Sequence, residues 1–268
     1  MAETKYLKNL LSEVGHGVHN LNTIAVALSN LPGNSSVNPE LNIRWEPENV
    51  RASSFSARRF AVRSSIVFAA EALFEYMDSI SADPVWKSLN NDLDFRRALA
   101  SHDSKAKRFS EFCKKIPGVN REWFLLVELL CHWRNRIVHA STSKAQLSSS
   151  DEKYLVSKAS EIYQNFYHFD VSQTLYDYEA DKVTLKEATT LITLMIKCCR
   201  KIDEYYMFSL GGCQDDIFHE ILSSDDVFKK LRNQQSSHKR SRQIDRHIRI
   251  QFCYLSNEKV LGLIEKYK

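Results

Sequence analysis

Apolar residues at helical spacing constrain this chain more than any other feature. They recur every three or four positions over three long stretches, residues 5–31, 53–77 and 185–208. Such spacing places the apolar side chains on one face of an α-helix, which then packs against other helices. Only seven glycines and five prolines interrupt the 268 residues, so tight turns are few. The sequence therefore predicts an all-α fold, a helical bundle.

The strongest boundary signal is Gly211–Gly212, which is expected to end the helix over residues 185–208. We expect residues 1–212 to form one helical domain and residues 213–268 to form a small basic helical extension. Prolines make residues 32–49 the only long irregular stretch. Within it, Trp45 is expected to anchor the loop to the core.

The most apolar stretch, residues 121–140, also carries polar side chains at regular spacing. On a helix, His132, Asn135 and His139 fall within about 40° of Glu128, because the four residues are successively four, three and four positions apart. Arg136 borders this stripe. A buried polar group without a partner costs on the order of 1–3 kcal/mol, so the stripe requires partners or a ligand.

Arginine beside histidine suits chemistry on a phosphodiester. A guanidinium group binds phosphate as a bidentate fork, and an imidazole can move protons near neutral pH. No carboxylate cage for a metal accompanies them. The combination fits RNA cleavage by attack of the ribose 2′-hydroxyl, with His as acid or base and Arg stabilising the charge on phosphorus.

Residues 134–139 read Arg-Asn-Arg-Ile-Val-His, which resembles the Arg-x(4–6)-His motif of the HEPN superfamily. That family consists of all-α domains and includes many metal-independent ribonucleases, in which two protomers bring their motifs into one cleft. The resemblance covers about residues 58–208. It implies Arg134 and His139 as the catalytic pair, with Asn135 supporting them. It also implies a homodimer acting on RNA as a toxin or anti-phage defence effector, with a neutralising or regulatory protein partner.

Two features depart from the family pattern. Position 141 is Ser, so the Tyr of the extended toxin-type motif Arg-x4-His-x-Tyr is missing. On an ideal helix Arg134 points roughly 140° away from His139. Either the arginine arm reaches around, the helix unwinds near Ala140, or a partner chain supplies the complementary group. By this geometry Arg136 is the better-placed cation and a second candidate for phosphate binding.

The stripe is also compatible with a structural role. Cations and imidazoles near a helix C-terminus offset the negative end of its dipole. His132 and Asn135 can bond Glu128 or a neighbouring helix, and for His132 we favour this structural interpretation. Three tyrosines downstream, Tyr154, Tyr163 and Tyr167, can stack on bases or pack in the core, and their spacing favours the core.

Three arginines, Arg58, Arg59 and Arg63, occupy the first turns of the helix expected over residues 53–77, where cations oppose the helix dipole. They contact either phosphates or the carboxylates of neighbouring helices, and Arg59 and Arg63 are candidates for substrate binding. Glu71, farther along the same helix, is either a partner for an arginine of the motif or a surface residue.

The six cysteines show neither zinc-ligand spacing nor a disulfide framework. We therefore expect free thiols in a reducing environment, with no metal and no cofactor. The N-terminus has no signal-peptide core, and no apolar run approaches the roughly 18 residues of a membrane span. These features predict a cytoplasmic protein without a membrane anchor.

The C-terminal region is basic. Eight Lys or Arg and a single acid, Asp245, lie between Lys229 and Arg249, although the chain as a whole has a net charge of only +4. Such a cluster is typical of nucleic-acid binding. A flexible linker followed by an amphipathic helix explains it equally well.

These features predict a metal-independent endoribonuclease. The alternative is a catalytically silent HEPN domain that binds RNA or another protein. A third hypothesis is a purely structural helical bundle in which the motif is coincidental.

Overall fold

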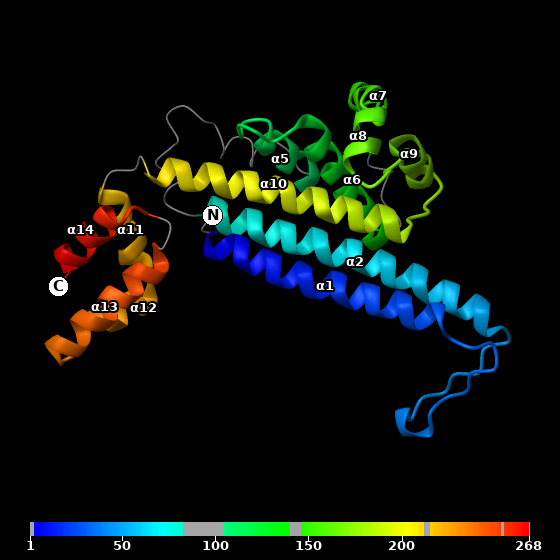
Figure 1. Ribbon diagram of the computed structural model, residues 1–268, viewed down its shortest axis with the longest axis horizontal. Helices are drawn as coiled ribbons and strands as arrows, with labels where there is room; N and C mark the ends of the chain where they lie inside the picture. The colour runs from blue at the N-terminus through cyan, green and yellow to red at the C-terminus, as the bar shows by residue number, and fades with distance from the viewer. Residues whose placement is uncertain (1–2, 83–103, 140–145, 212–214, 253–254, 268) are drawn as a thin grey trace.

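A computed structural model describes residues 3–82, 104–139, 146–211, 215–252 and 255–267. Within these ranges every regular element is a helix, which confirms the predicted all-α fold (Figure 1). The sequence also predicts a helix that Asp83 and Pro84 open and that runs to about Ala100, but these residues lie outside the described ranges. None of the described helices has the length and apolar character that crossing a bilayer requires.

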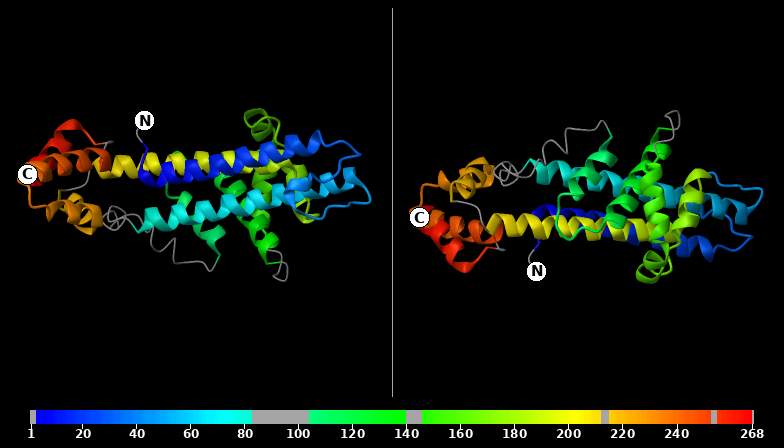
Figure 2. Two further views of the ribbon diagram at one scale, coloured as in Figure 1. Left: turned by 90° about the horizontal axis from the view of Figure 1, so that it is seen from below. Right: turned by 90° about the horizontal axis from the view of Figure 1, so that it is seen from above.

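Three long helices run side by side through the molecule (Figures 1 and 2). They are α1 (Lys5–Ser29), α2 (Val50–Ser81) and α10 (Leu185–Gly211). Helix α2 begins earlier than the sequence predicts because the Asn49 side chain accepts the backbone N–H of Ala52 at 2.9 Å. Helix α10 begins with a capping box, in which Thr184 and Glu187 bond each other's backbone N–H groups.

Helix α1 approaches α2 closely, and a glycine makes this possible. A Cβ atom added at Gly17 would lie 2.9 Å from Cδ1 of Phe68, which is closer than side chains pack. The apolar face of α1 is buried against α2, as the sequence predicts. Gly15 and Gly17 do not divide the helix.

At the centre lies α6 (Arg121–Val138), which packs against α2, α5 (Lys105–Cys113) and α10. Its residues from Phe124 to Trp133 are all buried. Four free cysteines are buried with it, namely Cys113, Cys131, Cys198 and Cys199. Burial raises the pKa of Cys113, Cys131 and Cys199, so these thiols are protonated and unreactive.

A group of short helices covers the far end of the bundle from the C-terminus, α7 (Ser149–Ser157), α8 (Ala159–Asn165) and α9 (Val171–Glu179) (Figure 1). The sequence predicts a single helix from Ser150 or Asp151 to about Tyr167. This prediction is wrong, because the helix breaks at Lys158 and Tyr167 and His168 have left-handed backbone conformations. Tyr163 and Tyr167 are therefore exposed, and the expectation that they pack in the core is wrong. Only Tyr154 of the three tyrosines packs on the core.

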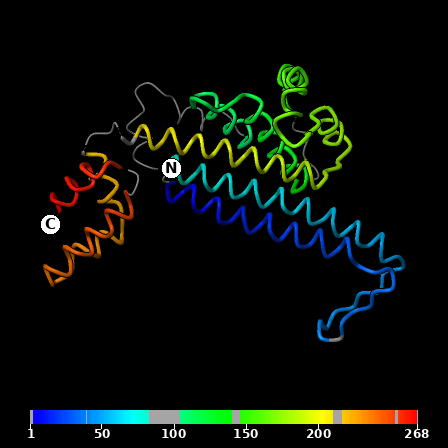
Figure 3. The backbone as a smooth tube through the Cα atoms, viewed as in Figure 1, coloured from blue at the N-terminus to red at the C-terminus, as the bar shows by residue number. Residues whose placement is uncertain are grey.

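Residues 30–49 form an arm that projects beyond the ends of α1 and α2 (Figure 3). It contains one short 3₁₀ turn, Pro39–Leu41. Trp45 does not anchor the arm to the core, contrary to expectation. Its ring instead lines a hollow made by residues of the arm itself and the start of α2, including Val37, Ile43 and Val50.

The C-terminal residues form a unit of short helices beyond the C-terminal end of α10 (Figures 1 and 2). They are α11 (Asp215–Ser224), α12 (Asp226–Arg232), α13 (Ser237–Gln251) and α14 (Asn257–Tyr267). Their apolar side chains pack on one another, with Phe218 edge-on to Phe252 and Phe228 edge-on to Tyr267. A polar contact also joins the start of α12 to α13, where His247 Nε2 lies 2.9 Å from Asp225 Oδ2.

Candidate active site

The motif lies where α6 emerges from the core. Residues up to Trp133 are fully buried, Arg134 to Ile137 are partly buried, and Val138 and His139 are exposed. The apolar part of the helix thus holds the polar end in a fixed position at the surface. This is the placement that a site for a large ligand requires, since the helix is rigid and its end is accessible.

Arg134, Asn135 and His139 come together at this end. Arg134 Nη1 lies 3.2 Å from His139 Nε2 and donates to Asn135 Oδ1 at 3.1 Å. The roughly 140° between Arg134 and His139 on an ideal helix is overcome in two ways. The helix ends at Val138, His139 leaves helical geometry with φ −118° and ψ 70°, and the arginine arm reaches around to meet it.

A carboxylate of α2 holds the other side of the guanidinium. Arg134 Nε and Nη2 lie 2.6 and 2.5 Å from Glu71 Oε1. Glu71 is therefore a partner of the motif, which was one of the two predicted roles. With the contacts to Asn135 and His139, four of the five N–H groups of Arg134 are engaged, and the fifth, on Nη2, is left for a ligand.

This arrangement fixes the tautomer of His139. A guanidinium can only donate, so Nε2 of the imidazole must accept, and the neutral ring carries its proton on Nδ1. As placed, Nε2 is occupied by the Arg134 donor, so the ring can accept a proton there only once Arg134 turns toward an anion.

No family model, curated protein or solved structure matches this chain. The assignment of the site therefore depends on its own geometry and on the motif.

The earlier half of the predicted stripe forms a separate, sealed cluster. Glu128 and His132 are 1% and 2% exposed. Glu128 Oε1 lies 3.2 Å from His132 Nε2 and 2.5 Å from Lys107 Nζ, and its Oε2 accepts from the Ser110 hydroxyl at 2.5 Å. Burial alone would raise the pKa of Glu128, but these hydrogen bonds outweigh it and lower the pKa. His132 thus has the structural contacts that we favoured.

The remaining candidate arginines gather elsewhere, at the end of α9. Arg136 donates to the Tyr178 carbonyl oxygen, and its guanidinium carbon lies 4.0 Å from the centre of the Tyr178 ring. Arg63 Nη1 lies 2.9 Å from Asp181 Oδ2, and Arg59 Nη2 donates to the Asp181 carbonyl oxygen at 3.0 Å. The structure brings Arg59, Arg63 and Arg136 to one segment, but it bonds none of them to His139.

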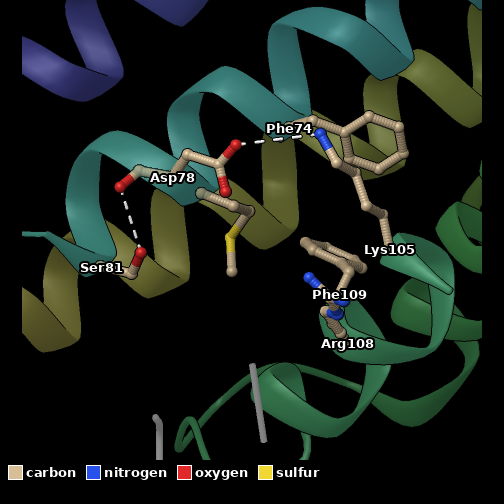
Figure 4. A pocket seen from close by; sticks show the side chains of 7 residues that line it. Phe74, Asp78, Ser81, Lys105, Arg108 and Phe109 are labelled. Atoms are coloured by element: carbon tan, nitrogen blue, oxygen red, sulfur yellow. Dashed lines mark hydrogen bonds and ion pairs between the residues drawn. The ribbon is translucent and has the colours of Figure 1, made fainter. Parts of the chain in front are cut away.

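A pocket opens between α2 and α5, and its lining is Phe74, Met77, Asp78, Ser81, Lys105, Arg108 and Phe109 (Figure 4). A neighbouring hollow along α2 reaches Glu71. Lys105 Nζ lies 3.8 Å from Asp78 Oδ2, and Glu71 and Glu75 add two more carboxylates. This surface is unsuited to an RNA phosphate, because its acids outnumber its cations near Glu71. No pattern in the sequence indicates this pocket.

Proposed function

We propose that this chain is a metal-independent endoribonuclease of the HEPN type. The observation that carries the proposal is the 3.2 Å approach of Arg134 Nη1 to His139 Nε2 at the accessible end of α6. An always-charged donor and a proton-transfer group side by side are what an in-line attack on a phosphodiester needs.

In the proposed reaction the ribose 2′-oxygen bonds to phosphorus while the bond from phosphorus to the 5′-oxygen breaks. The proton of the 2′-hydroxyl passes to a base, and the leaving 5′-oxygen receives a proton from an acid. His139 serves in one of these roles, and Arg134 stabilises the negative charge on the phosphoryl oxygens. Asn135 orients the guanidinium. The products are a 2′,3′-cyclic phosphate and a 5′-hydroxyl.

The reaction uses an acid and a base, and α6 offers only one accessible imidazole. His132, the other histidine of α6, is sealed against Glu128. A second copy of the chain would supply the second imidazole, so we propose a homodimer with the two ends of α6 facing one cleft. The biological role that suits such an enzyme is a toxin or antiviral defence effector restrained by a protein partner, acting in the cytoplasm.

A catalytically silent HEPN domain is the second candidate, and one contact favours it. The Glu71 carboxylate occupies two N–H groups of Arg134 that a phosphate would use. A domain in this state would bind RNA or a protein partner without cutting.

The experiment that separates the candidates is incubation of the purified protein with total RNA in EDTA. Wild type is compared with Arg134→Ala, and product ends are tested for the cyclic phosphate. Cleavage by wild type alone supports the ribonuclease. Cleavage that stops on chelation contradicts the metal-independent mechanism, and cleavage that survives Arg134→Ala contradicts the site. Retention of RNA without cleavage supports the silent domain.

A further inference from the structure

Helix α13 in the C-terminal unit carries a stripe of exposed cations on one face. The stripe consists of Lys239, Arg242, Arg246 and Arg249, and all four are exposed. Their spacing of three, four and three residues keeps them within about 80° of one another around the helix. Along the axis they span about 15 Å.

Most of these charges have no protein partner. Arg249 Nε lies 2.6 Å from Asp245 Oδ1. In the parts of the chain that the structure describes, no acid pairs with Lys239, Arg242 or Arg246. By contrast, three cations of the bundle, Lys107, Arg121 and Arg134, are each bound to a carboxylate. Unpaired cations on one face are available to a polyanion.

The opposite face of α13 is already buried. Ile244 and Ile248 are 1% and 0% exposed, and the helix packs on α12 and α14. An amphipathic helix that binds a membrane must place its apolar face in the lipid, and here that face is buried within the unit. Only Ile250 of the apolar residues of α13 is exposed. The geometry therefore favours a ligand that presents a row of negative charges to a rigid helix.

We propose that this stripe binds the RNA backbone and anchors the substrate at a distance from the cleavage site. The choice of RNA rests on the proposed function. Arginine forks and lysine ammonium groups neutralise phosphates and release their counterions, without reading the base sequence. The stripe lies beyond the C-terminal end of α10, whereas the motif end of α6 bonds α9 near the other end of the bundle (Figure 1). The protein would therefore hold an RNA at two separated points.

The test is RNA affinity as a function of salt, measured by fluorescence anisotropy with a labelled single-stranded RNA. All full-length variants carry His139→Ala, so that the RNA stays intact. Arg242→Gln with Arg246→Gln is compared with a matched loss of two exposed charges on the bundle, Lys8→Gln with Lys153→Gln. Arg242→Lys with Arg246→Lys keeps the charge. Circular dichroism checks that each variant is folded.

We expect the double Gln variant to bind roughly tenfold more weakly at physiological salt, with a salt slope smaller by about 1.4, because two phosphate contacts are lost. The bundle control should bind within about twofold of the parent and the Lys variant within about threefold, since each keeps the cations of the stripe. Equal affinity and slope for the Gln variant and its parent would overturn the proposal. Binding of each variant to vesicles of anionic lipid is measured in parallel. The proposal would also be overturned if the Gln variant lost binding to these vesicles while its RNA binding stayed unchanged.

These outcomes are independent of the ribonuclease test. RNA that binds through α13 and is never cut contradicts the proposed enzyme and leaves this proposal standing. RNA that is cut by a protein whose α13 variants bind normally contradicts this proposal alone.

Discussion

Helix α6 carries two polar clusters in succession, and they differ in their surroundings. Glu128 and His132 are sealed against Lys107 and Ser110 of α5, with burial close to complete. Beyond His132, Arg134 and Asn135 are partly buried and His139 is exposed at the end of the same helix. The sequence presents both clusters as one stripe. The comparison teaches that similar residues have different roles according to whether the helix around them is buried or emerging.

Replacing each of the two histidines by alanine should give the largest difference between the clusters, in RNA cleavage and in stability. His139→Ala should reduce RNA cleavage by about 10²–10⁴-fold and leave stability within about 0.5 kcal/mol, because the side chain is exposed and its proposed role is proton transfer. His132→Ala should lower the free energy of unfolding by about 2–4 kcal/mol, because it opens a cavity and removes a partner of Glu128. Cleavage assays and urea titrations on both variants measure these effects. Equal losses of stability would erase the distinction.

Acid should weaken the sealed cluster specifically. The pKa of Glu128 is lowered in the folded state, so the unfolded chain takes up the proton at higher pH. Its stabilisation is therefore complete above the ordinary Glu pKa of about 4.3 and is lost as pH falls through the lowered folded pKa. Urea titrations from pH 7 to pH 3 measure this loss. At neutral pH the free energy of unfolding of wild type should exceed that of Glu128→Gln by about 1–3 kcal/mol. The gap should close in acid, and a gap independent of pH would contradict this account.

Glu71 should weaken the binding of RNA at the cluster of Arg134, Asn135 and His139. Glu71→Gln removes a carboxylate from the side of Arg134 that a phosphate approaches, so RNA should bind about threefold more tightly at physiological salt. Anisotropy in a His139→Ala background measures the change. Glu75→Gln, on the same face of α2 but without a bond to Arg134, is the control. Unchanged or weaker binding would mean that Glu71 only orients the guanidinium.

Arg136→Lys should give the smallest effect. Lysine loses the planar contact with the Tyr178 ring, at a cost of about 1 kcal/mol in stability. Cleavage should stay within about twofold of wild type, because Arg136 bonds α9 and not His139. A larger loss of cleavage would restore Arg136 as a phosphate contact.

Much of the architecture follows from the sequence because periodicity dictates it. The apolar spacing predicts α1, α2, α6 and α10, and turn residues place the breaks between them. Tertiary contacts decide the exceptions. The break at Lys158 carries no glycine or proline, so the sequence does not show it, and Tyr167 is 84% exposed in consequence. Trp45 is apolar enough to suggest an anchor, but the arm has a hollow of its own to receive it.

The site is predicted in its members and not in its contacts. Arg134, Asn135 and His139 were identified from a short motif, and the structure brings them within 3.2 Å. The bond from Arg134 to Glu71 joins residues 63 positions apart, so nothing local to either residue decides between the two roles predicted for Glu71. Ideal helical angles favoured Arg136 over Arg134. They fail here because a helix that stops does not follow its own periodicity.

The end of α6 at Val138 is therefore as necessary to the proposed chemistry as the side chains are. One further turn of α6 would point the imidazole away from the guanidinium, toward the opposite side of the helix. The pair would then be separated although the motif sequence is unchanged. Four residues between Arg and His thus place the pair together only when the helix ends where it does. Variants that lengthen or stiffen this terminus would keep the motif intact and still separate Arg134 from His139.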